Sequence, residues 1–228
     1  ICEKNKIPFH RTLDFLLHNP NEIKTNDDTP YTIYSFFYKK AKIFPTRKII
    51  KNNKKNYSNK NISNREIGKL EITNSEIIGG RKEALKILKD IKQFANYDKV
   101  RDFPSLNQTT LLSAHNKFGT ISIREIHTQI KETLGINHTI MGEIYWREFF
   151  NYILFHFPYV EKKSFREKFQ KIPWETSEES LKKWQEGKTG FPIVDAGMRQ
   201  LNQTGFMHNR VRMIVASFLT KDLHIDWR

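Results

Sequence analysis

A long apolar and aromatic segment places the strongest constraint on how this chain folds. HTIMGEIYWREFFNYILFHF covers residues 138–157 and stops directly before Pro158. Proline lacks the backbone N–H that a helix interior needs, so the segment predicts one long helix that ends at this point. The first expectation is therefore a helical domain that contains this segment.

Apolar residues repeat at helical spacing in several other segments of the second part of the chain. Ser122 and Glu125 form a capping-box pair before one apolar stripe, and Gly135 ends that stripe. Pro192 suits the first turn of another helix, which Gly205 closes. No hairpin, alternating strand pattern or internal repeat accompanies them. We therefore predict an all-α domain, with helices in residues 80–97, 122–134, 138–157, 192–204 and 207–223.

The segments between and before these helices have different characters. PYTIYSFFYKKAKIF, residues 30–44, has helical spacing and predicts one helix. RKIIKNNKKNYSNKNISN, residues 47–64, is rich in Lys and Asn without periodicity, which favours a solvated linker over a DNA-binding tail. VRDFPSLNQTTLLS, residues 100–113, predicts a loop that is rich in hydroxyl and amide groups.

The charge of the chain indicates the kind of partner. Thirty-nine Lys and Arg residues against 25 Asp and Glu give a formal net charge of +14, which favours a polyanion, with nucleic acid ahead of a membrane. No apolar run has the length of a membrane span, so we expect a cytoplasmic protein. The single Cys2 excludes an internal disulfide framework and a cysteine-based metal cluster, and no metal site is expected.

Two helix faces mix side chains that rarely share a core. Glu143, Trp146, Arg147 and Phe150 have i, i+3, i+4 and i+7 spacing, so they share one face of the long helix. One interpretation is a surface ion pair between Glu143 and Arg147 beside an ordinary core stripe. The other interpretation is one wall of a functional site.

The last predicted helix carries a second mixed face, with Asn209, Arg212, Met213 and Ala216 on one side and Arg210 pointing elsewhere. Asn and Arg can bind base edges or phosphates, and Met offers a soft apolar contact. Together the two faces indicate a lined cavity, although a polar surface remains an alternative. The hydroxyls of TTLLS, residues 109–113, suit a phosphate. No GxGxxG, Walker-type, HExxH or GxSxG motif is present, so kinase and hydrolase functions are disfavoured.

The C-terminal part of the sequence resembles a known family. EGKTGFPIVDAGMRQLNQTGFMHNRVRMIVASFLTKDLHIDWR, residues 186–228, closely resembles the photolyase and cryptochrome family, specifically its class I cyclobutane pyrimidine dimer photolyases. Weaker similarity extends through IYWREFF, LLSAHNKFGTISIREI and YDKVRDFP. The resemblance implies a mainly α fold, an incomplete helical FAD-binding domain preceded by a linker and the tail of an α/β antenna domain. The implied boundaries are 1–12 for the antenna tail, 13–79 for the linker and 80–228 for the helical domain.

The resemblance implies FAD as the cofactor. A folate-type antenna, methenyltetrahydrofolate, is implied for the antenna domain, which is mostly absent from this sequence. The sequence departs from the family at Leu111, where Arg is common, and at Ile140 and Phe206, where Trp is usual. The residues that the resemblance assigns to FAD are Tyr97, Thr109, Thr110, Leu111, Leu112, Ser113, Ile140 and Arg212.

The same resemblance implies light-dependent repair of cyclobutane pyrimidine dimers in DNA by electron transfer from excited, reduced FAD. This activity is expected of the full-length protein and not of these 228 residues alone. Trp174 and Trp227 are implied to relay electrons to the flavin. The alternatives are a cryptochrome-like photoreceptor, against which Asn209 argues, and a degenerate remnant without catalysis. A monomer in the bacterial cytosol or nucleoid, with DNA as its partner, is expected. The residues implied to contact DNA or the lesion are Arg101, Glu143, Trp146, Arg147, Phe150, Asn209, Arg210 and Met213.

Overall fold

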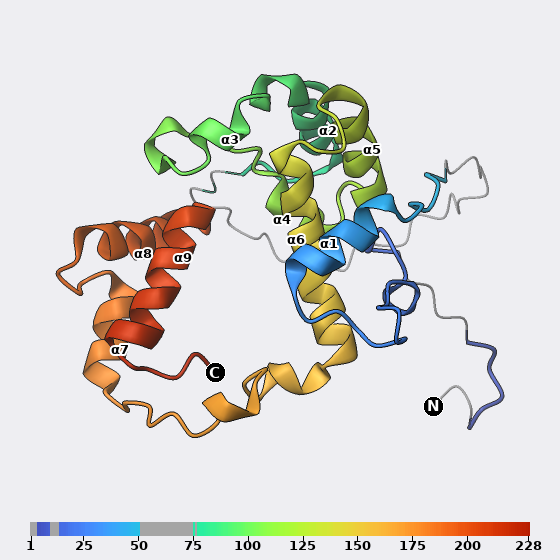
Figure 1. Cartoon of the computed structure of the whole chain (residues 1–228). Helices are drawn as coiled ribbons and strands as arrows, with labels where there is room; N and C mark the ends of the chain where they lie inside the picture. Colours follow the sequence, from blue (N-terminus) through green and yellow to red (C-terminus); the bar gives the residue numbers. More distant parts are fainter. Residues whose placement is uncertain (1–3, 10–13, 51–74, 76) are drawn as a thin grey trace.

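The protein is mainly α-helical in a computed structural model that describes residues 4–9, 14–50, 75 and 77–228 (Figure 1). These residues include no β-strand, only one isolated parallel bridge between Glu175 and Ile225. The mainly α fold class is therefore confirmed. The α-helices are α1 (Tyr34–Ile43), α2 (Arg81–Lys89), α3 (Tyr97–Val100), α4 (Leu112–Phe118), α5 (Ile123–Thr133), α6 (Thr139–His156), α7 (Glu178–Glu186), α8 (Pro192–Thr204) and α9 (Asn209–Ser217).

Short helical turns connect these helices. Five are 3₁₀ turns, and a π-helical turn follows α9 directly. They cover η1 (Pro20–Glu22), η2 (Ile91–Phe94), η3 (Pro104–Leu106), η4 (Pro158–Glu161), η5 (Glu167–Phe169) and the π turn η6 (Phe218–Asp222). Cys2 and most of the Lys/Asn-rich stretch lie outside the described residues, so the linker interpretation of that stretch stays a prediction.

The caps that the sequence indicated are present at three helices. Ser122 and Glu125 form the complete capping box of α5. Pro192 opens α8, and Gly205 closes it at φ 70°. Helix α6 ends one residue before Phe157, as the following proline requires. Because these signals are local, the sequence located these helices to within a few residues.

The helix predicted over residues 80–97 is wrong as one continuous element. Helix α2 ends at Lys89, and Asp90 leaves the helical region with φ −94° and ψ 18°. The chain continues as η2 and then α3. Ile91 is completely buried in the core. The turn at Asp90 changes the direction of the chain while the Ile91 side chain stays in this core.

A first core surrounds α6, and segments far apart in the sequence contribute to it. Helix α1 crosses α6, where the Tyr34 hydroxyl donates to the Gly142 carbonyl at 2.8 Å. The residues before α1 are also anchored, since the Leu17 N–H donates to a Glu148 carboxylate oxygen at 2.9 Å. The side chains that fill this core include Leu17, Ile23, Phe37, Ala41, Leu88, Ile91, Leu112, Ile126, Ile130, Ile140, Met141, Tyr145 and Tyr152.

A second, smaller core joins α7, α8 and α9. The indole N–H of Trp184 donates to the Val215 carbonyl at 3.1 Å and covers this core from α7. Gly197 allows α8 and α9 to come very close, because a Cβ at this position would lie 2.4 Å from a methyl of Val211. The buried residues are Val194, Met198, Met207, Val211, Val215 and Phe218.

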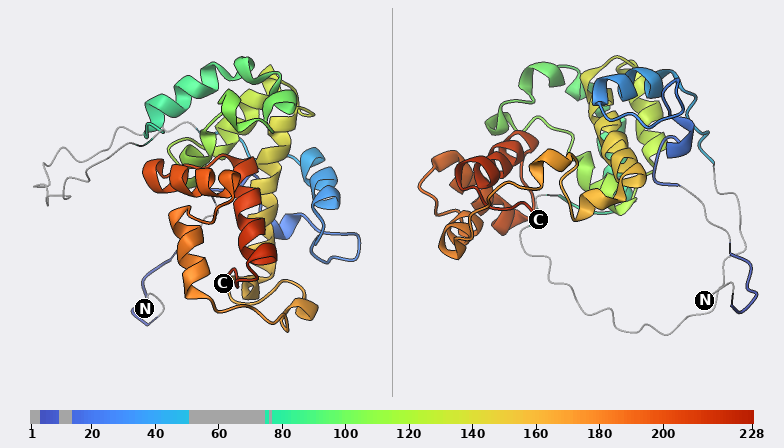
Figure 2. Two further views of the ribbon diagram at one scale, coloured as in Figure 1. Left: turned by 90° about the vertical axis from the view of Figure 1, so that its left-hand side faces the viewer. Right: turned by 60° about the horizontal axis from the view of Figure 1, so that its bottom comes forward.

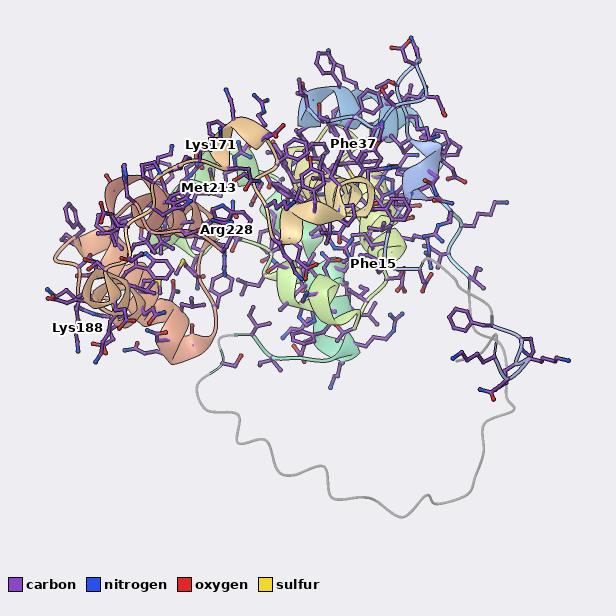
Figure 3. All side chains as sticks on the ribbon, turned by 90° about the horizontal axis from the view of Figure 1, so that it is seen from below. Phe15, Phe37, Lys171, Lys188, Met213 and Arg228 are labelled. Atoms are coloured by element: carbon purple, nitrogen blue, oxygen red, sulfur yellow. The ribbon has the colours of Figure 1, made fainter. Side chains whose placement is uncertain are left out.

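The two cores form separate groups of helices that lie beside each other (Figures 1 and 2). The segment between α6 and α7 connects them along the chain. Seen from below, Met213 belongs to the α7–α9 group, whereas Phe15 and Phe37 belong to the larger group (Figure 3). The helices that carry the two mixed faces, α6 and α9, are therefore parts of different groups.

Candidate functional site

A cavity of about 390 Å³ lies between the two groups of helices. It combines aromatic, amide and thioether side chains with two carboxylates and two guanidinium groups. Seven of the eight residues predicted to contact DNA or the lesion line it, together with two of those predicted to bind FAD. The lining residues are Tyr97, Arg101, Asp102, Thr109, Glu143, Trp146, Phe150, His208, Asn209, Arg210 and Met213.

Helix α6 supplies an aromatic wall. The ring of Trp146 stacks on Tyr34 of α1, with centroids 3.5 Å apart and planes at 8°. Phe150 stacks against Trp146 at 5.6 Å and 23°. Both keep exposed area on the cavity side of the helix, 37% of Trp146 and 64% of Phe150. Large exposed aromatic rings in a cavity are suited to stack on a planar ligand.

Glu143 is the acidic group of the same wall. Its carboxylate accepts a hydrogen bond from Arg101 at 2.9 Å, and Arg101 lies directly after α3. Burial raises the pKa of Glu143 above its usual value, and Arg101 opposes this shift. The alternative interpretation, a surface ion pair between Glu143 and Arg147, is wrong, because Arg147 instead donates to the buried Glu148 at 3.2 Å.

Helix α9 supplies the opposite wall through its first turns. His208 is the N-cap, and its Nδ1 accepts from the Arg210 N–H at 3.2 Å. Burial lowers the pKa of His208, which keeps the ring neutral and able to accept this bond. Asn209, Arg210 and Met213 line the cavity beyond the cap.

The direction expected for Arg210 is wrong. Its side chain lines the same cavity as Asn209 and Met213, and its Nη1 lies 3.6 Å from the sulfur of Met213, three positions further along the helix. The reason is Asp102, whose Oδ1 accepts from Arg210 Nε at 3.0 Å and also from Nη2. A long guanidinium side chain follows such a partner rather than the direction of its Cβ. Arg212 is exposed and does not line this cavity.

The residues predicted for FAD do not all gather in one place. Thr109 and Tyr97 line the main cavity, where burial raises the pKa of Tyr97 to about 12. Thr110 caps the following turn, since its hydroxyl accepts from the Leu112 N–H at 3.4 Å. Leu111 has a positive φ of 54°, and Leu112 and Ile140 are buried in the first core.

A second, polar cavity of about 340 Å³ is lined by Ser113, the last residue of the TTLLS segment. Ser113 lies there with Arg147, which the structure thus separates from the main cavity. The set of two cations, one hydroxyl and two amides suits an anionic group such as a diphosphate. The lining residues are Phe15, Ser113, Asn116, Lys117, Arg147 and Asn151.

The two tryptophans predicted to relay electrons, Trp174 and Trp227, line a third cavity of about 400 Å³. Backbone pairing brings their segments together, because the Glu175 N–H donates to the His224 carbonyl at 2.8 Å. The structure thus places both indoles at one site, more than fifty residues apart in sequence.

Two lining residues of the main cavity, His208 and Asp102, and one residue that supports its wall, Tyr34, were not assigned from the sequence. His208 has no neighbouring histidine in the sequence, and a lone histidine is more often structural than functional. Asp102 follows Arg101 in the motif YDKVRDFP, so adjacency to a predicted site residue was an available signal. Tyr34 supports Trp146 from another helix, and no local pattern indicates such a contact.

The described residues contain no group of three or more His, Cys, Asp and Glu side chains placed to hold a metal ion. Within the same residues, none of the helices combines the length and the apolar character needed to cross a membrane.

Comparisons with known proteins point to one family. A family model described as the FAD binding domain of DNA photolyase matches residues 140–228. A deoxyribodipyrimidine photo-lyase from Alkalihalophilus pseudofirmus is 36% identical over 240 residues, covering 99% of this chain and 50% of that protein. The chain thus spans about half the length of the curated relatives it matches.

Two solved structures share the fold at similar levels of identity. A bacterial class III photolyase from Agrobacterium tumefaciens has a TM-score of 0.76 and 33% identity, over 94% of this chain and 48% of that one. An archaeal photolyase from Sulfolobus tokodaii, described with two FAD molecules and a novel light-harvesting cofactor, has a TM-score of 0.73 and 31% identity. The alignment with it covers all of this chain and 50% of that one.

Proposed function

Since the chain belongs to the DNA photolyase and cryptochrome family, we propose that the protein repairs cyclobutane pyrimidine dimers in DNA by light-driven electron transfer from reduced FAD. The observation that carries this proposal is the main cavity, in which an aromatic wall faces a wall of amide, thioether and guanidinium groups. Its volume of about 390 Å³ falls within the range of about 300–1,000 Å³ that ligand sites occupy.

The cavity suits a pair of bases that has left the DNA stack. Unstacking costs a few kcal/mol, and least for a damaged site, which favours selection of the lesion. Trp146 and Phe150 stack on the flipped bases, and Met213 contacts them from the opposite helix. Asn209 hydrogen-bonds a base edge from the same side.

The charged groups of the cavity have two roles in this proposal. Glu143, which is ion-paired with Arg101, holds a carboxylate against a base edge, where it can accept a hydrogen bond. Arg101 and Arg210 contact backbone phosphates at the cavity mouth. Arg147 contacts Glu148 and the polar cavity, so its proposed role shifts from the lesion to an anion there.

The residues present fit a bound FAD in the chemistry of their donors. Thr109 faces the main cavity, whereas Ser113, Lys117 and Arg147 surround the polar cavity and would hold the diphosphate. FAD, when bound in its reduced form, supplies the excited-state electron that splits the dimer. The protein residues bind, orient and exclude water. Trp174 and Trp227 are proposed to relay electrons toward this cofactor.

Several finer points of the sequence interpretation remain proposals. The class I assignment is one, and one structural relative is described as a class III enzyme. A folate-type antenna, a monomeric state and a location in the cytosol or nucleoid are others. The domain boundaries at residues 12 and 79 also remain predictions.

Replacement of Trp146 by alanine tests the lesion site. Trp146→Ala is expected to weaken binding to dimer-containing DNA by about 1–3 kcal/mol, the value of one lost stacking contact, with little effect on undamaged DNA. Phe155→Ala is the matched control, because Phe155 is an exposed aromatic residue of the same helix outside the cavity. Fluorescence titration measures both affinities. Equal losses on the two DNA forms would contradict a lesion-stacking role.

Repair itself is tested by illuminating flavin-loaded protein with dimer-containing DNA and counting restored pyrimidines. Repair that depends on light supports the proposal. Bound flavin without repair would instead support the cryptochrome-like alternative, and a protein that binds no flavin would support the remnant.

A further inference from the structure

Four charged side chains at the mouth of the main cavity form two ion pairs. Arg101 pairs with Glu143 at 2.9 Å, and Arg210 pairs with Asp102. The two arginines are those proposed to contact backbone phosphate. In the protein without DNA, each of them is therefore already neutralised by a carboxylate of its own chain.

The two pairs differ in their surroundings. Glu143 lies in the wall of the cavity, where burial raises its pKa. The Asp102 side chain is half-exposed at 51%, and the hydrogen bond from Arg210 holds its pKa below the usual value. Arg101 and His208 also face Asp102. Asp102 thus carries a full negative charge at neutral pH, at the place where a phosphate would meet Arg210.

The Asp102–Arg210 pair also joins the two groups of helices. Asp102 follows α3, which packs against α6 in the larger group, whereas Arg210 belongs to α9. The pair therefore spans the cavity mouth. A ligand that enters the cavity between these groups can displace it, whereas a DNA backbone that stays outside leaves it in place.

We propose that Asp102 is a specificity-determining residue. Its carboxylate binds the Arg210 guanidinium in place of a phosphate, and this keeps Arg210 from binding the phosphates of undamaged DNA. A flipped dimer enters the cavity and brings its own phosphate to Arg210, so the exchange takes place only in the damaged complex. This inference rests on the proposed function. An exposed ion pair is weak, so a nearby phosphate can replace it.

The test compares Asp102→Asn with the wild-type protein on undamaged and dimer-containing duplexes over a range of salt concentrations. Each phosphate contact contributes a slope of about 0.9 in the dependence of log affinity on log salt. Asp102→Asn is expected to steepen the slope for undamaged DNA by up to about 0.9, with several-fold tighter binding at low salt. The slope for dimer-containing DNA should stay unchanged, because that contact already exists.

Asp98→Asn is the matched control, since it removes the same charge from an exposed position of α3 outside the cavity lining. If Asp102→Asn steepens the salt slope for undamaged DNA no more than Asp98→Asn does, the inference is overturned. Arg210→Gln provides a second check. In that background Asp102→Asn should no longer change the slope, because the two residues act as one pair.

The outcomes separate this inference from the proposed function. A wild-type protein that does not prefer dimer-containing DNA would contradict the proposed function, whatever the variants do. A wild-type protein that does prefer it, with equal slopes for Asp102→Asn and Asp98→Asn on undamaged DNA, would contradict only the role of Asp102.

Discussion

At the scale of single residues, the position of Trp146 depends on a tyrosine of another helix. Tyr34 covers one face of the indole, and its hydroxyl is held by the Gly142 carbonyl in the turn before Trp146. Tyr38 stacks behind Tyr34 at 5.6 Å and 8°. The indole that we propose to meet the lesion is thus part of an aromatic stack that begins in α1 and continues to Phe150.

Tyr34 does not line the main cavity, so its replacement should affect the lesion site only through the position of Trp146. Tyr34→Leu is expected to lower the affinity for dimer-containing DNA by about 2- to 10-fold, since an aromatic pair contributes about 0.5–1.5 kcal/mol beyond its area. Tyr34→Phe keeps the ring and should retain most of the affinity. Titration with damaged and undamaged DNA measures this, and thermal unfolding controls for stability. A loss shared by both forms of DNA would show a merely structural role.

Sequence reasoning was strongest for residues whose role follows from their place on a helix. Glu143, Trp146 and Phe150 were predicted to share a face, and all three line one cavity. Arg147 and Arg210 were less predictable, because long charged side chains follow their partners. The partner of Arg147 is the next residue of the helix, Glu148, whereas the partner of Arg210, Asp102, lies 108 positions away in the sequence.

At the scale of elements, the close packing of α8 on α9 depends on the absence of a side chain at Gly197. A Cβ at Gly197 would lie 2.4 Å from one Val211 methyl and 3.1 Å from one Val215 methyl. At such distances the two helices have to move apart. The fit of this helix pair therefore tolerates no larger residue at position 197.

Gly197→Ala is expected to lower the free energy of unfolding by about 1–3 kcal/mol, the usual cost of overpacking a core. Gly142→Ala is the matched control, because a Cβ there would meet the Tyr34 hydroxyl at an ordinary 3.6 Å. That control should be neutral or slightly stabilising, since alanine favours a helix over glycine. Urea unfolding followed by circular dichroism measures both. Equal stability of the two variants would contradict the close packing.

Helices with strong local signals were predictable, and others were not. Helix α7 has Ser177 as N-cap and Gly187 as C-cap, but none of its residues is fully buried, so its apolar pattern is weak. Helix α4 starts after Leu111, a non-glycine residue at φ 54°, and sequence rules do not anticipate that conformation. The break at Asp90 follows from the burial of Ile91, which is a tertiary demand.

At the scale of the whole molecule, buried ionisable groups fasten the segment before α1 to the first core. His18 stacks on Tyr145, whose hydroxyl meets His127 at 3.3 Å. Burial lowers the pKa of both histidines to about 4. Burial raises the pKa of the neighbouring Glu148 to about 7, against the opposing effect of Arg147.

These shifts predict loss of stability in mild acid. Between pH 6.5 and pH 4 the unfolded histidines bind protons that the folded ones do not, so their contribution falls as the pH falls. Glu148 acts in the opposite sense below pH 7, because its folded form holds the extra proton. Two groups outweigh one, so the free energy of unfolding in urea should decrease from pH 6.5 to pH 4.5.

Two variants separate these contributions. His18→Phe should make the decrease shallower, since the aromatic contacts remain and one titrating group is removed. Glu148→Gln should make it steeper, because the opposing group is lost. A pH profile that neither variant changes would show that the acid sensitivity arises elsewhere.

The meeting of the two groups of helices was the least predictable feature from sequence. The family resemblance indicated which residues belong to one site, and periodicity indicated which residues share a helix face. Neither indicates that Asp102 and Arg210 meet across the cavity mouth, because this contact joins residues 108 positions apart. Such long-range contacts depend on packing that no local pattern encodes.

The backbone pairing between Glu175 and Ile225 brings together the two ends of the segment that contains α7, α8 and α9. This segment, from Glu175 to Ile225, is thus held at its two ends by main-chain atoms. Trp174 and Trp227 lie close to these ends in the sequence. Main-chain hydrogen bonds do not depend on side-chain identity. Substitution of the exposed Glu175 side chain should therefore leave the placement of the two indoles unchanged.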